Sequence, residues 1–576
     1  MSLPLDAMTV AGFGDQGLDA WFTGLGDEFL GRIPVGSLRP RMVEGWRLLW
    51  RGRELEIQVD ADFPFSVARA YLVGYSRAAA EPHVERDGKL CLATKAVPGD
   101  RLRTVQAVVA DAVQLLTDNE TRKHDDDFRD DFGLYWLSWA TSGDARVEVL
   151  PGPHGADKTM LGRAVTTTNG RTLVFPDKAE ATKVWKNLTG APPMALRETP
   201  VIAIDPLPAP DRYPETAEEL WALVEARSQD GVGLLKRLMN NSPKEAVVVL
   251  AGKAPSGREH YAAMYLRRPL DRGGKPFNRR TMRKDIDPSK ETTRTVFGRF
   301  KLDRVFTQRM DSSASRLPEG VRAQMKGAMV IIAGCGALGS GVARMLAQAG
   351  VEHLRLVDPE DLGWENIRRH ELGALAVGTG KAKSLADSIR ASLPTISLVE
   401  GFASTFAAFA REHPEALKAA DLVISCTGEW VADSSVEDAL SQPGQNAAAI
   451  YGWMEPHALA THAVLIGNSG KKFADGFDDQ GQFRLPVVAG GKPPPAECGG
   501  ASTPFGAVEL AHAQALVARL AIDVLRGLAD APVWRSWLAD ATAFQEADAS
   551  VTSGWAAARG QPDDVGGPYE GDWAFP

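Results

Sequence analysis

One loop constrains the fold of this chain more than any other segment. The stretch "VIIAGCGALGSGVARML" (330–346) holds Gly334, Gly336 and Gly339 in G-x-G-x-x-G spacing, between an apolar strand-like run and a helix-like run. Glycine permits the tight turn and the close approach of the backbone to a phosphate, which the N-terminus of the following helix attracts. We therefore expect these three glycines to bind a nucleotide.

The surrounding pattern indicates the architecture of that region. Strand-like and helix-like runs alternate over residues 321–525, which predicts a mostly parallel, Rossmann-like sheet covered by helices. Asp358 ends the next strand, nineteen residues after Gly339, where a carboxylate accepts hydrogen bonds from ribose hydroxyls. On these residues alone, a nicotinamide-dependent dehydrogenase and an ATP-using enzyme both remain open.

Three polar residues that follow Asp358 separate the two classes. A dehydrogenase has no general need for the amide of Asn366 and the cations of Arg369 and Lys381 beside its nucleotide, whereas nucleotidyl transfer places growing charge on the phosphates. With this N-x-x-R pair and the G-x-x-K that ends at Lys381, residues 326–520 resemble the adenylating domain of ubiquitin-activating enzymes and their bacterial sulfur-carrier relatives. The resemblance implies ATP with Mg²⁺, nucleotide contacts by these three residues, catalytic roles for Arg369 and Lys381, and an acyl-adenylate on a partner protein's C-terminus.

One position departs from that family's pattern. Gly428 stands where the family usually has an Asp that helps to hold Mg²⁺, and the adjacent Glu429 is the alternative ligand. The sequence therefore leaves the metal ligand open. The chain also lacks a C-x-x-C pair, which many sulfur-carrier activators use to bind zinc.

The four cysteines are too few for a disulfide framework in a chain of 576 residues. Cys335 in the glycine loop and Cys426 in an apolar strand are expected to be packing residues. Cys498 lies in a Gly/Pro-rich stretch before a helix-like run, where a thiol is accessible and its pKa can be lowered. Activating enzymes place their thioester cysteine in a crossover loop or an inserted domain, so the resemblance makes Cys498 the predicted first thioester site.

The remaining thiol, Cys91, lies in the polar, turn-rich segment "EPHVERDGKLCLATK" (81–95). Strand-like runs over 47–77 precede it, and a helix with an apolar face from Val105 to Leu116, capped by Thr104, is predicted to follow. This α+β order, with Phe63-Pro64, a Pro-His turn and the Cys, resembles a ubiquitin-conjugating enzyme. In that family an Asn lies eight positions before the catalytic Cys, and His83 occupies that position, as in the bacterial branch. The resemblance implies that Cys91 is the second thioester site and that His83 donates a hydrogen bond there.

The two resemblances define three expected domains: a ubiquitin-conjugating-like α+β domain (1–145), a linker domain (146–320) and a Rossmann-like α/β adenylating domain (321–576). Fusions of this order are typical of bacterial CBASS antiphage operons, where they ligate the C-terminus of a cGAS-like nucleotidyltransferase to a target. The implied relay passes a partner's C-terminal tail from the adenylate to Cys498, to Cys91 and then to a lysine of an acceptor protein. "RVFTQRM" (304–310) resembles the arginine-bearing helix that reaches across homodimers of such enzymes, so Arg309 is an expected nucleotide contact within a homodimer.

Composition and charge limit the partners and the location. The net charge of −9 argues against direct nucleic-acid binding. No apolar run reaches the length of a membrane span, and the first residues lack a signal-peptide pattern, so we expect a cytoplasmic protein without membrane contact. The alternatives are the same chemistry on a bacterial ubiquitin-like modifier, a sulfur-carrier adenylyltransferase, an NAD-dependent oxidoreductase, and a non-enzymatic adaptor that binds a partner's tail.

Overall fold

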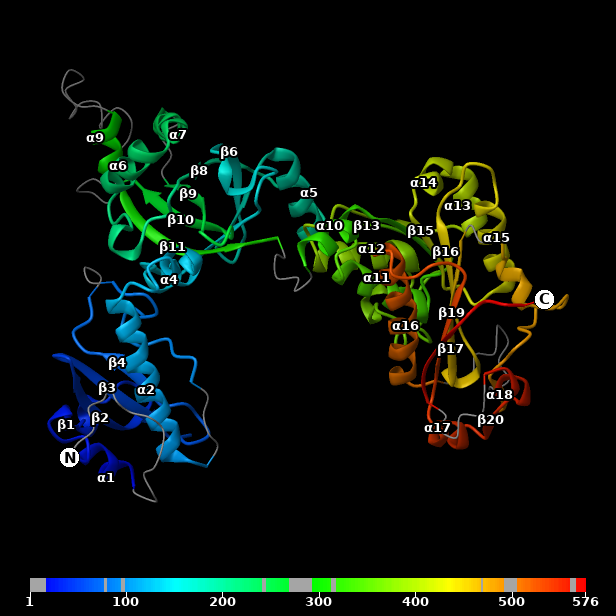
Figure 1. The fold of residues 1–576 in the computed structure, drawn as a ribbon. Coiled ribbons are helices and arrows are strands. Elements are labelled where there is room, and N and C mark those ends of the chain that lie inside the picture. The colour runs from blue at the N-terminus through cyan, green and yellow to red at the C-terminus, as the bar shows by residue number, and fades with distance from the viewer. Residues whose placement is uncertain are drawn as a thin grey trace. The chain divides into compact units, whose positions relative to one another are not determined.

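The computed structural model describes residues 17–76, 80–94, 99–240, 245–268, 293–311, 318–467, 470–491, 505–559 and 566–575. The chain divides into two compact units (Figure 1). The first unit comprises Met1–Thr182 with Pro193–Asp311, and the second comprises Lys183–Pro192 with Ser312–Pro576. The expected division of the chain into three domains stays a prediction.

The first unit begins with a four-stranded antiparallel sheet in the order β1-β2-β3-β4. Its strands are β1 (Phe29–Arg32), β2 (Met42–Trp50), β3 (Arg53–Asp60) and β4 (Arg69–Leu72). Helix α2 (Arg101–Glu120) buries the predicted apolar face, from Val105 to Leu116, in one cluster with β2, β3 and β4. The predicted cap was wrong: the side chain of Asp100 accepts the N–H of Arg103, while the hydroxyl of Thr104 donates back to the carbonyl of Asp100.

A closed barrel of seven strands completes the first unit, in the order β10-β11-β5-β7-β6-β8-β9. Its strands are β5 (Ser142–Val149), β6 (Met160–Thr166), β7 (Arg171–Phe175), β8 (Arg197–Ala203), β9 (Glu245–Lys253), β10 (Glu259–Arg267) and β11 (Lys301–Arg309). Along β9, Val247, Val249 and Ala251 join one hydrophobic cluster, whereas Ala246, Val248 and Leu250 join another. Because both faces of this strand are buried, its sequence reads as an unbroken apolar run.

Helices cover the barrel and connect it to the N-terminal sheet. The described helices of the first unit besides α2 are α1 (Leu18–Thr23), α3 (Asp127–Asp130), α4 (Phe132–Ser138), α6 (Ala217–Arg227), α7 (Gln229–Asn240) and α9 (Thr293–Gly298). Helix α5 (Lys178–Thr189) begins in the first unit and belongs to the second from Lys183 on. Trp136 of α4 is buried and its indole N–H donates to the carbonyl of Val305 at 2.9 Å. The segment after α2 is therefore anchored on the barrel wall.

The second unit is built on an eight-stranded sheet in the order β14-β13-β12-β15-β16-β17-β19-β21. Its strands are β12 (Met329–Ala333), β13 (His353–Val357), β14 (Leu398–Phe402), β15 (Leu422–Ser425), β16 (Ala448–Met454), β17 (Ala460–Ile466), β19 (Val533–Leu538) and β21 (Gly567–Gly571). The pairs from β14 to β16 are parallel and those from β16 to β21 are antiparallel. The predicted combination of an α+β N-terminal fold and a mostly parallel, Rossmann-like C-terminal sheet is confirmed.

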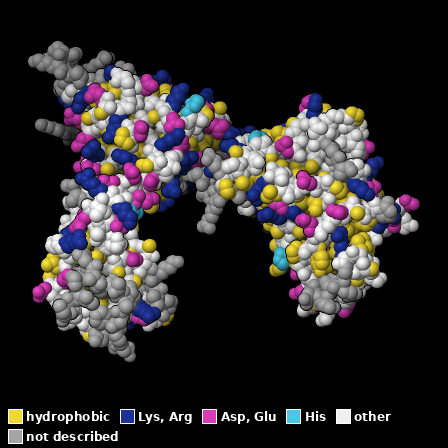
Figure 2. All heavy atoms as spheres, in the orientation of Figure 1, with side chains coloured by type: hydrophobic (Ala, Val, Ile, Leu, Met, Phe, Trp, Pro, Cys, Tyr) yellow, Lys and Arg dark blue, Asp and Glu magenta, His cyan; other side chains and the backbone are white. Residues whose placement is uncertain are grey.

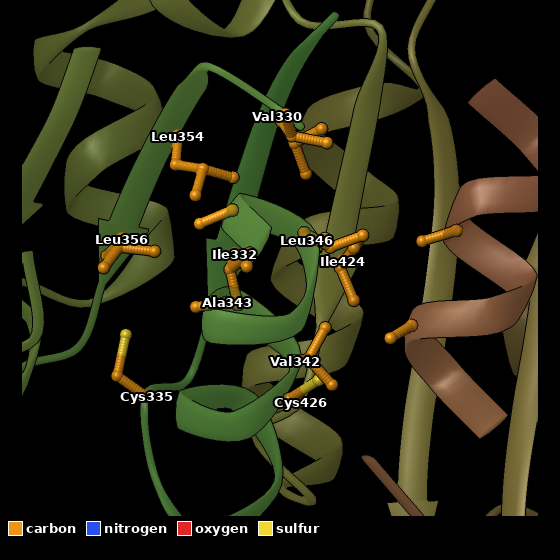
Figure 3. Packing of buried hydrophobic residues seen from close by; sticks show 14 of the residues in the cluster. Val330, Ile332, Cys335, Val342, Ala343, Leu346, Leu354, Leu356, Ile424 and Cys426 are labelled. Atoms are coloured by element: carbon orange, nitrogen blue, oxygen red, sulfur yellow. The ribbon is translucent and has the colours of Figure 1, made fainter. Parts of the chain in front are cut away.

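One face of this sheet packs on α11 (Ala337–Gln348), α12 (Lys381–Ser392) and α16 (Ala507–Leu525). Figure 3 shows Ile332 and Ile424 of the sheet facing Val342 and Leu346 of α11. Cys335 and Cys426 belong to the same buried cluster, which confirms that they are packing residues. The other helices and short strands are α10 (Glu319–Gly327), α13 (Phe406–Glu412), α14 (Pro414–Lys418), α15 (Trp430–Leu440), β18 (Val488–Gly490), α17 (Ala541–Glu546), β20 (Ala549–Val551) and α18 (Ser553–Arg559).

On the face shown in Figure 2, acidic and basic side chains are interspersed over the described surface of both units. Among the residues described, no helix combines the length and the apolar character that crossing a bilayer requires.

Candidate active site

The glycine loop connects β12 to α11, and two of its glycines are required by the protein's own packing. Gly334 has φ +84°, and a Cβ there would lie 2.9 Å from the carbonyl of Cys426. A Cβ on Gly339 would lie 1.9 Å from the carbonyl oxygen of Gly334. Gly336, the N-cap of α11, is different, since a Cβ there would meet nothing within 4 Å. Gly334 and Gly339 thus hold the shape of the loop, whereas Gly336 leaves space in front of the helix N-terminus.

A cavity of about 520 Å³ opens beside this loop, at the carboxyl ends of the parallel strands. Its lining includes Gly334, Gly336 and Asp358. Its volume is within the range of small-molecule sites, and its position is where ligands bind in parallel α/β sheets. The structure thus brings three of the predicted nucleotide residues to one cavity.

Asp358 fixes the loop through both carboxylate oxygens. Oδ2 accepts the backbone N–H of Cys335 at 2.7 Å, and Oδ1 accepts that of Glu360 at 2.8 Å. A carboxylate has about four lone-pair sites, so these two bonds leave capacity to accept ribose hydroxyls. Contact with a ribose stays a prediction.

The described lining of the cavity does not include Gly339, nor the three polar residues predicted to contact the nucleotide, Asn366, Arg369 and Lys381. The side-chain oxygen of Asn366 accepts the N–H of Gly363 at 2.9 Å and closes its own turn. The guanidinium of Arg369 lies 5.8 Å from the centroid of the Phe505 ring. Lys381, only 6% exposed, donates from Nζ to Oε2 of Glu360 at 2.5 Å, and Glu360 lines the cavity. Lys381 is thus separated from the cavity by the side chain of Glu360, with which it pairs.

Sequence reasoning missed several residues of the cavity wall. Thr405, in the turn after β14, and Phe406, the first residue of α13, line it, and Glu360 lines it from the turn after β13. The carboxyl ends of neighbouring parallel strands meet at one edge of the sheet. The polar residues that follow the strand at 398–402 could therefore have been predicted from sequence to line the cavity.

Two carboxylates that follow Gly428 in the sequence, those of Glu429 and Asp433, bear on which residue holds Mg²⁺, and they lie in different environments. Glu429 lines the cavity together with Asp358 and Glu360, so the cavity offers oxygen ligands of the kind that Mg²⁺ prefers. Asp433 is buried behind the wall, and its Oδ1 accepts the hydroxyls of Ser425 (2.5 Å) and Thr427 (2.8 Å). Burial raises the pKa of Asp433 above its usual value, while the two hydroxyls act against that rise.

Cys91 is the exposed thiol among the described residues. Its backbone N–H donates to the carbonyl of His83 at 2.8 Å, and its Sγ lies 3.5 Å from Oε1 of Glu85. Although the residue as a whole is exposed, partial desolvation of the thiol, followed by the charge and hydrogen bond of Glu85, raises the pKa of Cys91 to about 11. The neutral thiol is therefore favoured in this environment.

His83 is held by three contacts. It has φ +59°, a backbone conformation that is uncommon for a side-chain-bearing residue. Its N–H donates to the hydroxyl of Tyr135 at 2.5 Å, its carbonyl accepts from Cys91, and its Nε2 lies 2.8 Å from Oδ2 of Asp127. The ring is thus paired with Asp127, and a hydrogen bond from His83 to an acyl group on Cys91 stays a prediction. Asn119, which sequence reasoning missed, fixes the preceding residue by donating to the carbonyl of Pro82 at 2.9 Å.

Two other predicted residues have different outcomes. Cys498 lies outside the described residues, so its role stays a prediction. The helix expected over 304–310 was wrong, because residues 301–309 form strand β11 of the barrel. There the guanidinium of Arg309 pairs with Asp311 (2.6 Å) and Glu259 (3.3 Å), and its contact with a nucleotide stays a prediction.

Comparison with known protein families finds a match for the N-terminal region and another for the region of the glycine loop. Residues 311–449 match the ThiF family, and residues 41–143 match Prokaryotic E2 family B. This chain is a fusion of a ubiquitin-conjugating-like and a ubiquitin-activating-like domain. Two relatives share the name "ATP-dependent ubiquitin transferase-like protein Cap2". The one from Enterobacter hormaechei is 27% identical over 305 residues, which cover 49% of this chain and 47% of the relative. The one from Pseudomonas aeruginosa is 24% identical over 83% of this chain and 86% of the relative.

The extent of these likenesses limits what they establish. The fusion spans about half the length of the Enterobacter relative that it matches. Among solved structures, Escherichia coli MccB with ATP is 16% identical over 41% of this chain and 65% of that chain, with a TM-score of 0.30. A TM-score that low supports no inference. The activity, substrates and partners of the whole protein are therefore proposals.

Proposed function

We propose that this fusion uses ATP to activate the C-terminus of a partner protein and conjugates it to an amine through two cysteine thioesters. One observation carries the proposal: the glycine loop and Asp358 line a single nucleotide-sized cavity in the ThiF-matched unit, in the same chain as an exposed Cys91 in the E2-matched region. A dehydrogenase would leave that exposed cysteine without a role.

The adenylation step is proposed for the cavity. Gly336 and the N-terminus of α11 hold the phosphates of ATP, and Asp358 holds the ribose. Glu360 and Glu429, which line the cavity, are the proposed residues that would hold Mg²⁺, and the ion would neutralise phosphate charge when bound. The partner's terminal carboxylate attacks the α-phosphorus, and pyrophosphate leaves. Lys381 and Arg369 stabilise the charge that develops on the phosphates.

The conjugation steps follow by acyl transfer. The thiolate of Cys498 attacks the acyl carbon and AMP leaves, giving the first thioester. The thiolate of Cys91 takes the acyl group and frees Cys498, and an acceptor amine then forms an amide and frees Cys91. Each step breaks one acyl bond and forms another, which divides a difficult acylation into easier ones. Because the pKa of Cys91 is raised, a base must remove its proton as the acyl group arrives.

The proposed partners rest on the resemblance of the domain order to conjugating-plus-activating fusions. We propose the C-terminal tail of a cGAS-like nucleotidyltransferase, in a CBASS antiphage system, as the activated carboxylate, a lysine as the acceptor, and a homodimer as the working form. The printed name of the relatives describes an ATP-dependent ubiquitin transferase-like protein, which also fits a bacterial ubiquitin-like modifier as the activated tail.

Intact mass spectrometry of the Cys91→Ser variant, expressed together with its native genomic neighbours, tests this function. Serine retains the acyl group as a slowly cleaved ester. We expect an added mass equal to a partner protein less one water, mapped to position 91, and its value separates a nucleotidyltransferase from a small modifier. Cys91→Ala is the matched control, because it loses the same thiol and cannot form the ester. The adduct must also disappear when Cys498 or Lys381 is replaced by Ala.

Two other outcomes would overturn the relay. An unmodified Cys91→Ser protein that still binds ATP would indicate an adaptor, or an activator without a thioester on the conjugating-like domain. An adduct that persists in the Lys381→Ala background would show that adenylation by this cavity is not its source.

A further inference from the structure

Two histidines and an aspartate converge beside the Cys91 segment. Nε2 of His83 and Nδ1 of His124 each lie 2.8 Å from Oδ2 of Asp127. The ligand atoms of all three residues lie within 4.8 Å of one another. The two rings stand edge to face, with centroids 5.2 Å apart and planes at 90°, so each ring presents a nitrogen to the same oxygen.

Hydrogen bonds alone do not account for both nitrogens of His124 in its neutral form. Its other ring nitrogen, Nε2, lies 3.5 Å from Oδ2 of Asp118, which also pairs with Lys123 at 2.8 Å. A neutral imidazole has one N–H, and it cannot donate to Asp127 and to Asp118 at once. A second proton on the ring would satisfy both carboxylates, and so would a cation bound at Nδ1, because the single proton of the neutral ring then resides on Nε2 and faces Asp118. Such a carboxylate–histidine–metal arrangement is the usual outer shell of a metal site.

We propose that His83, His124 and Asp127 bind a divalent transition-metal ion, with Zn²⁺ as the preferred occupant. Two imidazole nitrogens and one carboxylate oxygen form a ligand set typical of zinc, with three protein ligands and one position for water. Ligand atoms around a tetrahedral ion at these bond lengths lie about 3.3 Å apart. The nitrogen-to-oxygen distances of 2.8 Å need to open by only about half an ångström to admit the ion.

The site would fasten three parts of the first unit at one point. His83 belongs to the turn whose carbonyl accepts the N–H of Cys91, His124 lies in the turn after α2, and Asp127 begins α3. The side chains of the three ligands are partly buried, with 24–32% of their surface exposed, so an ion from solution can reach them. The proposed role is to position the Cys91 segment, and the proposal does not depend on adenylation or conjugation.

Metal binding to the full-length protein tests the site directly. The protein is purified without a histidine tag, stripped with chelator and titrated with Zn²⁺ alone. The Cys91→Ser, Cys498→Ser background removes these two thiols as competing ligands. We expect one ion per chain. His124→Gln and Asp127→Asn should abolish this binding, and Asp118→Asn should weaken it by about 10- to 100-fold. His154→Gln, at an exposed histidine in the same unit, is the matched control and should retain it.

A second measurement avoids any dependence on the folding of the ligand variants. Co²⁺ bound to the double-serine protein with all three ligands intact should give the visible spectrum of a four- or five-coordinate site with nitrogen and oxygen ligands and no sulfur-to-metal charge-transfer band. The proposal is overturned if that protein retains no ion, if its Co²⁺ spectrum is that of a hexa-aqua ion, or if correctly folded His124→Gln binds Zn²⁺ as tightly as the parent.

Discussion

Replacing Glu85 by Gln should make Cys91 more reactive. The Glu85 carboxylate lies 3.5 Å from Sγ of Cys91 and disfavours the thiolate through its charge and through its hydrogen bond with the neutral thiol. Lys89 acts in the opposite direction, since its ammonium lowers the pKa of the thiol while it pairs with Glu85 at 2.7 Å. Glutamine keeps the shape of the side chain and removes the charge, so the pKa of Cys91 should fall.

The expected size follows from the causes of the rise. The pKa of Cys91 is raised from 9.0 to about 11, and burial, which the substitution leaves in place, is the largest cause. Removing Glu85 should therefore return only part of the rise, and each pH unit by which the pKa falls gives about tenfold more thiolate near pH 8. A thiolate of lower pKa is also a weaker nucleophile, with a Brønsted coefficient of about 0.4–0.5. The net gain in the rate of thiol–disulfide exchange at pH 8 is then about threefold for each pH unit by which the pKa falls.

The assay is the reaction of the folded protein with a neutral aromatic disulfide between pH 7 and pH 11, in a Cys498→Ser background. Cys335 and Cys426 are buried, so the fast phase reports Cys91. The rise of the rate with pH should shift to lower pH in Glu85→Gln and to higher pH in Lys89→Gln, which removes the opposing charge. The electrostatic account of Cys91 is refuted if Glu85→Gln leaves this pH dependence in place or shifts it to higher pH.

Three further outcomes follow from the second unit. Gly336→Ala should retain the thermal stability of the parent but weaken ATP binding, because its Cβ points into open space beside the cavity, whereas Gly339→Ala should lower the unfolding free energy by about 1–3 kcal/mol through the clash with Gly334. Lys381→Ala should reduce ATP–pyrophosphate exchange by about 100-fold, and Lys383→Ala, an exposed neighbour on α12, should not. Asp433→Asn should gain stability relative to the parent as the pH rises from 3.8 through the raised pKa of Asp433, because the ionised form of this buried carboxyl favours unfolding. Denaturant midpoints of both proteins at pH 5 and pH 8 measure this gain. A difference between the two midpoints that shrinks as the pH rises would contradict the prediction.

The second unit was largely predictable from sequence because its signals are local. The glycine loop, the strand before it and the helix after it are contiguous, and each apolar run became one element of the sheet. The burial of Cys335 and Cys426 followed from the apolar runs around them. The positions of Arg369 and Lys381 relative to the cavity were not predictable, because they depend on the path of the long turn between β13 and α12.

The barrel was not predictable because long-range pairing closes it. Strand β5 pairs in parallel with β11, with Val147 beside Thr307, and no local pattern reports a partner that distant. The error over 304–310 has a related cause. Arg304 is buried and donates to the carbonyls of Trp139 and Pro214, so a charged residue occupies an inward position and hides the alternation of a strand. A buried arginine that is satisfied by distant carbonyls has no signature in sequence.

His83 shows how the two proposals for the first unit constrain each other. In the neutral ring without a metal, if Nε2–H donates to Asp127, then Nδ1 carries no proton and can only accept one. His83 would then be a base for the Cys91 thiol or the incoming amine, and its ring could not donate to an oxyanion. When a metal occupies Nε2, the proton resides on Nδ1, and the ring becomes a donor of the kind that the Asn of conjugating enzymes provides. Whether Nε2 of His83 holds a proton or a metal thus decides whether the ring acts as a base or as a hydrogen-bond donor. Transfer from Cys91 to an amine, measured with and without Zn²⁺, should lose its dependence on the metal in His124→Gln if the ion acts through His83.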